Sequence, residues 1–369
     1  MKFNPHLDKV KSYEAGKPSE LLYREYNLKP SDIIKLASNE NPLGMSEMVA
    51  KSIQENIKLS SIYPDDTYHN LKNALADKYD VSSDEIIISN GSDQNIEFCI
   101  RSIDPENASI LTAKTTFAMY SIYANISNIK IHKTNSDIHI INEFKQEYIK
   151  HKPNIVFLCT PNNPLGDTLS LEDIISFIEI CDKNTLIVVD GAYMEYVQYK
   201  DKSRYVNPKD FIRKYDNVIC LRTFSKAYGL GGLRVGFGIA NKDIIKTLYK
   251  IRAPFNISQL SYYGAVTALQ DDEHIEKTVK NNFNEMEVYK KELDNMGLRY
   301  LPSLGNFITI FFEDIQSKDI ANMLLKIGII IRDLSAYNLN AIRITIGIKH
   351  QNIKVLEELK VCITKLTNR

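Results

Sequence analysis

The strongest constraint on the fold is the alternation of short apolar runs with amphipathic stretches between residues 85 and 240. Two runs, IVFLC at 155–159 and LIVV at 186–189, are apolar throughout, which is typical of strands covered by helices on both faces. Amphipathic stretches such as Asn95–Ile103 and Leu171–Cys181 predict the helices between strands. The predicted strands are Glu85–Ser89, Ser109–Thr112, Ile155–Thr160, Leu186–Asp190, Val218–Arg222 and Arg234–Ala240. This order predicts an α/β fold with a mostly parallel sheet.

The pattern changes after about residue 250, where we expect a smaller α+β domain. Its predicted elements are a long helix at Glu273–Met296, a strand at Phe307–Glu313, a helix at Lys318–Lys326, two short strands at Ile329–Arg332 and Ala341–Ile346, and a last helix at Ile353–Leu366. We therefore divide the chain into an N-terminal arm and helix that joins the small domain (1–30), a large domain (31–252) and a C-terminal small domain (253–369).

Composition narrows the possible partners. The 46 lysine and arginine residues balance 46 aspartate and glutamate residues, so no net charge attracts nucleic acid or an anionic membrane. No apolar run approaches the roughly 18 residues that a membrane-spanning helix needs. The five scattered cysteines form no CxxC pair, which predicts reduced thiols and a cytoplasmic protein. The histidines have no metal-ligand spacing, so we expect no metal site.

Four apolar runs end in polar loops. In an open α/β sheet, such loops gather beyond the carboxyl ends of the strands, where ligands bind. One such loop alone indicates little, because surface turns favour the same residues. Four loops with complementary chemistry favour a ligand site. The loops are Ser89-Asn90-Gly91-Ser92-Asp93, Thr160-Pro161-Asn162-Asn163-Pro164, Asp190-Gly191-Ala192-Tyr193 and Thr223-Phe224-Ser225-Lys226.

Lys226 is the first candidate for chemistry. A lysine after a strand is often only a solvated helix start, but this one lies beside the hydroxyls of Thr223 and Ser225 and upstream of Arg234. A lysine can hold an aldehyde cofactor as a Schiff base. Ser225 and Arg234 can bind a phosphate, and the planar guanidinium of the arginine can donate several hydrogen bonds to it.

The other loops supply what such a cofactor needs. Gly91–Asp93, at a helix start, offers backbone N–H groups to a phosphate. Asp190 can pair with a protonated ring nitrogen, although an aspartate after a strand can also be an N-cap or a Mg²⁺ ligand. Asn163 and Tyr193 can bind a ring hydroxyl, and Phe117 can stack on the ring. A lysine for an aldehyde, a carboxylate for a ring nitrogen and a set of phosphate-binding residues together indicate a site for pyridoxal 5′-phosphate (PLP). This cofactor is an electron sink for carbanions.

These loops belong to a longer ordered series: SNENPLG (38–44), YPDD (63–66), NGSD (90–93), TPNNPLG (160–166), VVDGAY (188–193) and RTFSKAYGLGGLRVG (222–236). The series resembles the fold-type I PLP-dependent transferases, and within them the histidinol-phosphate aminotransferase family, from Tyr13 to Arg343. The resemblance implies a large PLP-binding domain and a small α+β domain. It also implies transamination of histidinol phosphate with 2-oxoglutarate, in histidine biosynthesis.

The resemblance implies roles for the cofactor residues. Lys226 would carry PLP covalently and move the proton at the substrate α-carbon. Asp190 would keep the ring nitrogen protonated, while Asn163 and Tyr193 hold the ring hydroxyl. The cofactor phosphate would lie among Ser92, Asp93, Thr223, Ser225 and Arg234.

The resemblance implies substrate and partner contacts as well. Arg343 would bind the substrate carboxylate, with Asn39 nearby, and Arg332 and Tyr13 would recognise a substrate phosphate. Tyr63 would reach the cofactor phosphate of a neighbouring subunit, which implies a homodimer with shared active sites.

The same motifs bear on other possible functions. Threonine-phosphate decarboxylase and aromatic amino acid aminotransferase share the scaffold, and both stay open. A nicotinamide dehydrogenase would need GxGxxG, a spacing that the glycines at 229, 231, 232, 236 and 238 do not have. A serine hydrolase would need GxSxG, which is absent. A binding protein built on this fold would be expected to have lost Lys226 or Asp190, and both are present. Family members often have Glu and Thr where this chain has Gly191 and Leu165.

Overall fold

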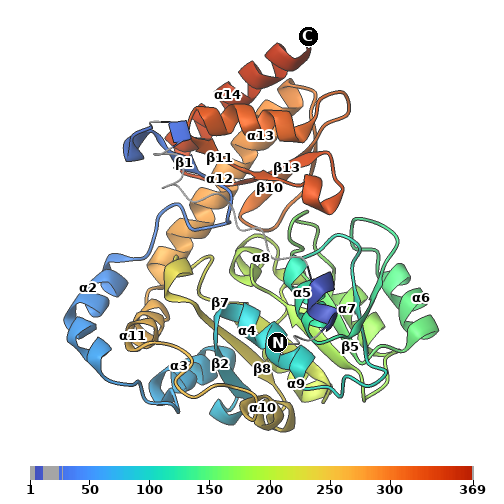
Figure 1. The fold of residues 1–369 in the computed structure, drawn as a ribbon. Coiled ribbons are helices and arrows are strands. Elements are labelled where there is room, and N and C mark those ends of the chain that lie inside the picture. Colours follow the sequence, from blue (N-terminus) through green and yellow to red (C-terminus); the bar gives the residue numbers. More distant parts are fainter. Residues whose placement is uncertain (1–4, 11–24, 27, 368–369) are drawn as a thin grey trace.

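The computed structural model describes residues 5–10, 25–26 and 28–367, which form a large α/β body and a smaller body (Figure 1). The large body is built on a seven-stranded sheet of order β2-β8-β7-β6-β5-β3-β4. Only β8 runs antiparallel to its neighbours, so the predicted mostly parallel sheet is confirmed. The strands are β2 (Ile86–Asn90), β3 (Ser109–Thr112), β4 (Lys130–Lys133), β5 (Ile155–Cys159), β6 (Leu186–Asp190), β7 (Val218–Thr223) and β8 (Val235–Ala240).

Side-chain alternation along the strands builds a core on each face of this sheet. In β5, Ile155 and Phe157 pack with residues of α4 (Gly91–Arg101) and α5 (Ala118–Ile126), whereas Val156 and Leu158 pack with residues of α6 (Ile141–His151) and α7 (Leu171–Ile178). Both faces are covered, which explains the uninterrupted apolar runs. The helices of this body are α2 (Glu47–Asn56), α3 (His69–Tyr79), α4 (Gly91–Arg101), α5 (Ala118–Ile126), α6 (Ile141–His151), α7 (Leu171–Ile178), α8 (Met194–Lys200), α9 (Pro208–Lys214), α10 (Lys242–Tyr249) and α11 (Gln259–Ala268).

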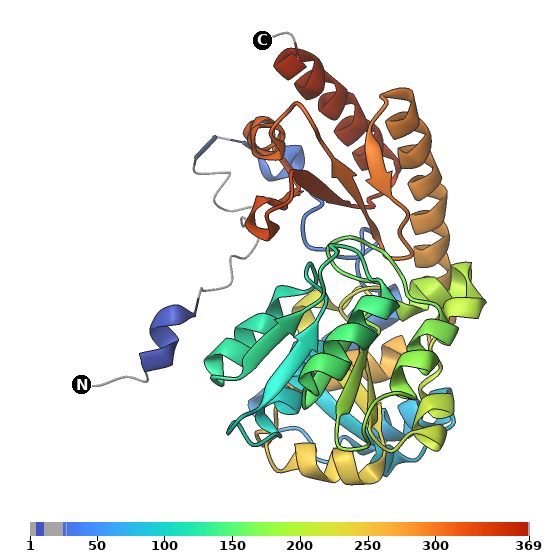
Figure 2. The ribbon, with the colours of Figure 1, turned by 90° about the vertical axis from the view of Figure 1, so that its right-hand side faces the viewer.

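The small body contains a four-stranded antiparallel sheet of order β12-β13-β10-β9. Its strands are β9 (Arg299–Leu301), β10 (Phe307–Phe311), β12 (Arg332–Asp333) and β13 (Ala341–Thr345), and its helices are α12 (Asp272–Asn295), α13 (Ser317–Lys326) and α14 (Lys349–Thr367). Helix α12 connects the two bodies, since Val279 packs with Tyr193 of the large body and Leu293 packs in the core of the small one. The small body stands above the large one in both ribbon views (Figure 2).

Several predicted strands begin or end at other residues in the structure, for example Phe307–Glu313, which ends at Phe311. Two differences have a clear physical reason. The segment Ile329–Arg332 is not one strand, because β11 (Ile329–Ile330) pairs in parallel with β1 (Ile34–Lys35) while β12 pairs with β13. Because β1 precedes β11 by almost 300 residues in the sequence, no local pattern indicates that the two strands pair. Strand β8 begins after Arg234, whose φ of 54° lies in the left-handed region. The sequence also missed β4, an edge strand with a lysine at each end.

Short 3₁₀ helices complete the described chain. Of the N-terminal segment 1–30, the structure describes a helix at 5–9, where His6 Nε2 lies 2.8 Å from the carbonyl oxygen of Ile126 in α5. No helix in the described ranges has both the length and the hydropathy for crossing a membrane. The 3₁₀ helices are η1 (Pro5–Lys9), η2 (Pro30–Asp32), η3 (Ile57–Ser61), η4 (Ser83–Glu85), η5 (Lys202–Arg204), η6 (Gly231–Leu233) and η7 (Ser335–Tyr337).

Candidate active site

A cavity lies at the carboxyl ends of β5, β6 and β7. All of its lining residues except Cys159 and Ala192 were predicted from the sequence as cofactor residues. The lining consists of Ser92, Asp93, Phe117, Cys159, Asn163, Asp190, Ala192, Tyr193, Thr223, Ser225, Lys226 and Arg234. The fold thus brings together residues that are up to 142 positions apart in the sequence, Ser92 and Arg234.

Lys226 lies in the turn after β7. Its Nζ donates a hydrogen bond of 3.0 Å to the carbonyl oxygen of Ser38 and lies 5.9 Å from the centroid of the Tyr193 ring. Burial, followed by the positive charge of Arg343, lowers the pKa of the Lys226 amine to about 8. At pH 7 about a tenth of the amine is therefore neutral, far more than for an ordinary lysine, and a nucleophilic lysine requires the neutral form.

Asp190 ends β6 and is only 3% exposed. Its Oδ2 accepts a hydrogen bond of 2.7 Å from the hydroxyl of Tyr120, and its Oδ1 accepts one of 3.2 Å from the backbone N–H of Ala192. Burial raises the pKa of Asp190, and these two hydrogen bonds oppose that rise. Sequence reasoning missed Tyr120, because an aromatic residue on a helix between strands reads as ordinary core.

The residues predicted for the phosphate meet where α4 begins beside β8. A Cβ atom on Gly236 would lie 2.3 Å from the backbone nitrogen of Ser92, so only glycine lets the two segments approach this closely. Arg234 Nη1 donates a hydrogen bond of 3.2 Å to Ser225 Oγ. Burial raises the pKa of Asp93, whose Oδ1 has no hydrogen-bond donor among the described residues. A helix start, a hydroxyl and a guanidinium placed together can bind an anion.

Residues of the small body contact residues that line the cavity. Arg343, in β13, donates hydrogen bonds to Asn163 Oδ1 and, at 2.7 Å, to the carbonyl oxygen of Ala37. Asn39 Nδ2 donates a hydrogen bond of 2.9 Å to the hydroxyl of Tyr193, and Thr345 Oγ1 lies 3.1 Å from Asn39 Oδ1. The predicted cofactor residues Asn163 and Tyr193 are thus connected to the predicted substrate residues Arg343 and Asn39.

Of the other two predicted substrate residues, Arg332 and Tyr13, the structure describes only Arg332. Arg332 lies in β12 directly opposite Arg343, which places both side chains on one face of the small sheet. Arg332 is half-buried. Tyr13 lies outside the described residues.

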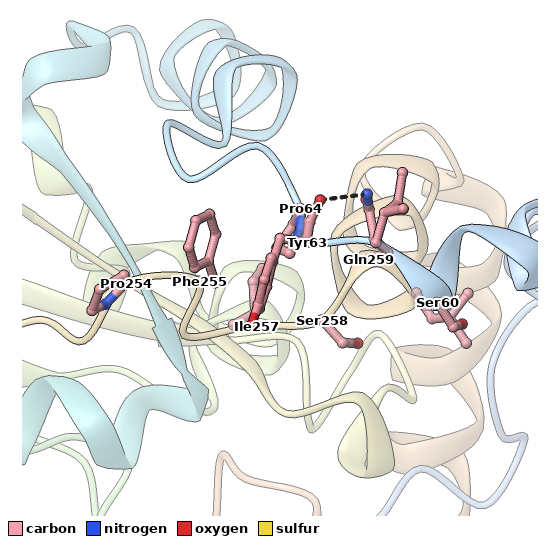
Figure 3. Close-up of a pocket in the computed structure, with 10 residues that line it drawn as sticks. Ser60, Tyr63, Pro64, Pro254, Phe255, Ile257, Ser258 and Gln259 are labelled. Atoms are coloured by element: carbon pink, nitrogen blue, oxygen red, sulfur yellow. Dashed lines mark hydrogen bonds between the residues drawn. The ribbon is translucent and has the colours of Figure 1, made fainter.

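Tyr63 is not brought to the cavity. Its side chain is 78% exposed and stacks on Phe255 with ring centroids 4.7 Å apart. Both rings line a separate surface pocket, together with Pro64, Ile257 and Gln259 (Figure 3). Gln259 Nε2 donates a hydrogen bond of 3.1 Å to the backbone oxygen of Tyr63. Within one chain, Tyr63 therefore has no contact with the predicted phosphate residues.

Comparison with known proteins agrees with this geometry. Residues 31–358 match the family Aminotransferase class I and II. The histidinol-phosphate aminotransferase of Helicobacter hepaticus is 51% identical over 97% of this chain and 98% of the relative, and that of Aliarcobacter butzleri is 51% identical over 99% of this chain and its full length. The crystal structure of the Sinorhizobium meliloti histidinol-phosphate aminotransferase in complex with PLP superposes with a TM-score of 0.90 at 24% identity, covering 99% of this chain and 98% of that one. The chain belongs to the class I and II aminotransferase family.

Proposed function

We propose that this protein is a PLP-dependent aminotransferase that exchanges an amino group between histidinol phosphate and 2-oxoglutarate in histidine biosynthesis. The relatives at 51% identity over nearly the whole chain support this substrate pair. The observation that carries the chemistry is that a lysine amine, a buried carboxylate and an anion site line one cavity. That combination matches the aldehyde, the ring nitrogen and the phosphate of PLP.

The residues present fit this cofactor. Lys226 would bind its aldehyde, Asp190 its ring nitrogen, and Asn163 and Tyr193 its ring hydroxyl. PLP supplies the electron sink that stabilises negative charge at the substrate α-carbon. The N–H groups at the start of α4, with Ser225 and Arg234, would hold the phosphate.

The protein's own groups have distinct tasks in this scheme. The amine of Lys226 removes and returns the proton at the substrate α-carbon, and its lowered pKa near 8 suits a base that works close to neutral pH. The negative charge of Asp190 retains a proton on the ring nitrogen. Asn39 orients the Tyr193 hydroxyl through their hydrogen bond of 2.9 Å.

The arginines of the small sheet would select the substrate. Arg343 and Arg332 are cross-strand neighbours, so an anion bound beside them is attracted by two positive charges. Glutamate presents a carboxylate to Arg343, whereas histidinol phosphate has no carboxylate and presents its phosphate to the pair. Arg332 is therefore the residue that distinguishes a phosphorylated substrate.

We also propose that the protein is a homodimer and that it works in the cytoplasm. Apolar side chains near the Tyr63 pocket are strongly exposed, with Ile57 at 57% and Ile62 at 58%. Exposed apolar patches commonly mark interaction surfaces. A second copy covering this region would bury it and bring Tyr63 toward the partner's phosphate site. The free cysteines are compatible with a reducing compartment.

A paired-substrate assay tests the proposed function. Histidinol phosphate, phosphothreonine and phenylalanine are each supplied with 2-oxoglutarate and PLP, and both glutamate and carbon dioxide are measured. We expect glutamate formation to be fastest with histidinol phosphate, without carbon dioxide release. Carbon dioxide from phosphothreonine would instead identify a decarboxylase, and a preference for phenylalanine an aromatic aminotransferase.

A further inference from the structure

We propose that Tyr120 is a positioning residue for Asp190, which it holds in place and keeps ionised for its role toward the cofactor ring. This inference rests on the proposed function, because it concerns how Asp190 acts on PLP. Tyr120 was not among the sequence-predicted site residues and does not itself line the cavity.

The position of Tyr120 is tightly set. Its ring is fully buried and stacks on Phe157 of β5, with centroids 4.5 Å apart and an interplanar angle of 14°. From there its hydroxyl reaches Asp190 Oδ2 at 2.7 Å. An ionised carboxylate only accepts hydrogen bonds, so the tyrosine is the donor. The packed ring therefore holds the hydroxyl against one carboxylate oxygen.

The surroundings of Asp190 show why such a donor matters. Burial raises the pKa of Asp190, and the nearby charge of Asp93 acts in the same direction. The Tyr120 hydroxyl, the Ala192 N–H and the charge of the buried Arg222 in β7 favour the ionised form. Burial also raises the pKa of Tyr120 well above 10, so the hydroxyl keeps its proton at working pH.

Tyr120 also connects Asp190 to the ring-stacking candidate. Phe117, which lines the cavity, precedes α5 and meets the Tyr120 ring edge-on, with centroids 5.8 Å apart and an interplanar angle of 85°. Replacing Tyr120 with phenylalanine removes only the hydroxyl and keeps both ring contacts. The variant thus separates the hydrogen bond from the packing.

The test is a double-mutant cycle in PLP affinity. The dissociation constant of PLP is measured for the cofactor-free parent, Tyr120→Phe, Asp190→Asn and the double variant. We expect Tyr120→Phe to weaken binding about tenfold, the lower end of the effect of a hydrogen bond to a charged group. In the Asp190→Asn background, the same substitution should change affinity less than about twofold, because the charge it supports is gone.

The control is Tyr289→Phe, which removes another buried tyrosine hydroxyl, one without a hydrogen-bond partner in the described part of the chain. It should leave PLP affinity unchanged. The proposal is overturned if Tyr120→Phe binds PLP like the parent while Asp190→Asn does not. It is also overturned if Tyr120→Phe weakens binding equally in both backgrounds, which would indicate a packing role. If Asp190→Asn itself binds PLP like the parent, the proposed role of Asp190 fails instead, and with it this inference.

Discussion

Arg332 and Arg343 lie directly opposite each other in the antiparallel pair β12–β13, so both side chains leave the same face of the small sheet. On that face, Arg343 reaches the large body through its hydrogen bond to Asn163 Oδ1. Under the proposed function, Arg343 would thus join a cofactor contact to a substrate contact, while its cross-strand neighbour adds a second positive charge. Arg343 would then serve any anionic substrate group and Arg332 a phosphate.

We expect Arg332→Ala to raise KM for histidinol phosphate about tenfold or more and to spare phenylalanine, which has no phosphate. Arg343→Ala should impair both half-reactions. Steady-state kinetics with the two amino donors measures the difference. Arg299→Ala, in edge strand β9 of the same sheet, is the control. Equal losses for both donors in Arg332→Ala would contradict the assignment of phosphate to this residue.

The lowered pKa of Lys226 predicts a pH-dependent stability of the cofactor-free protein. Folding shifts the pKa of this amine from 10.5 to about 8, so between these values the unfolded chain binds more protons than the folded one. The free energy of unfolding should therefore rise from pH 8 to pH 10.5, by at most about 3 kcal/mol.

Denaturant unfolding at several pH values, with Lys226→Met as the reference, isolates this contribution. The parent should be less stable than Lys226→Met at pH 7 and should approach it above pH 10.5. A difference between the two proteins that does not vary with pH would show that the amine is not shifted in this direction.

The contact of Gly236 with the start of α4 predicts a site that tolerates no side chain. Gly236→Ala places its Cβ 2.3 Å from backbone atoms of Gly91 and Ser92, so β8 and α4 must separate. We expect a loss of about 1–3 kcal/mol of stability together with weaker PLP binding. Gly232→Ala, where a Cβ meets nothing within 4 Å, is the matched control. Thermal unfolding and PLP titration measure both effects, and similar results for the two variants would rule out the close approach.

The exposed position of Tyr63 predicts complementation between subunits. Tyr63→Ala and Lys226→Ala should each be nearly inactive, but mixed heterodimers carry one intact site when Tyr63 serves the partner's cavity. Refolding the two variants together should then restore up to about a quarter of parental activity, since half of the dimers are mixed and each has one working site of two. Activity that persists fully in a diluted monomer would exclude shared sites.

Much of the large sheet was predictable because its strands are covered on both faces. In β6 the residues at 186–189 are all apolar, and the strand ends at Asp190, the first polar residue after them. Edge strand β4 carries no such run and escaped prediction. The lining of the cavity was predictable for a related reason: parallel strands end at one edge of the sheet, so the loops after β5, β6 and β7 converge.

The sequence by itself determined which loops line the cavity, because Lys226, Asp190 and Asn163 each follow a recognisable strand. Only the tertiary structure decided which residues from distant parts of the sequence contact these side chains. Tyr120 meets Asp190 because α5 packs on β5, and Arg332 meets Arg343 because two short strands pair in one register. Tyr63 lies at the surface because the chain around it packs beside Phe255 rather than over the cavity. Local patterns record the burial of a segment, whereas contacts between segments depend on packing that no local pattern encodes.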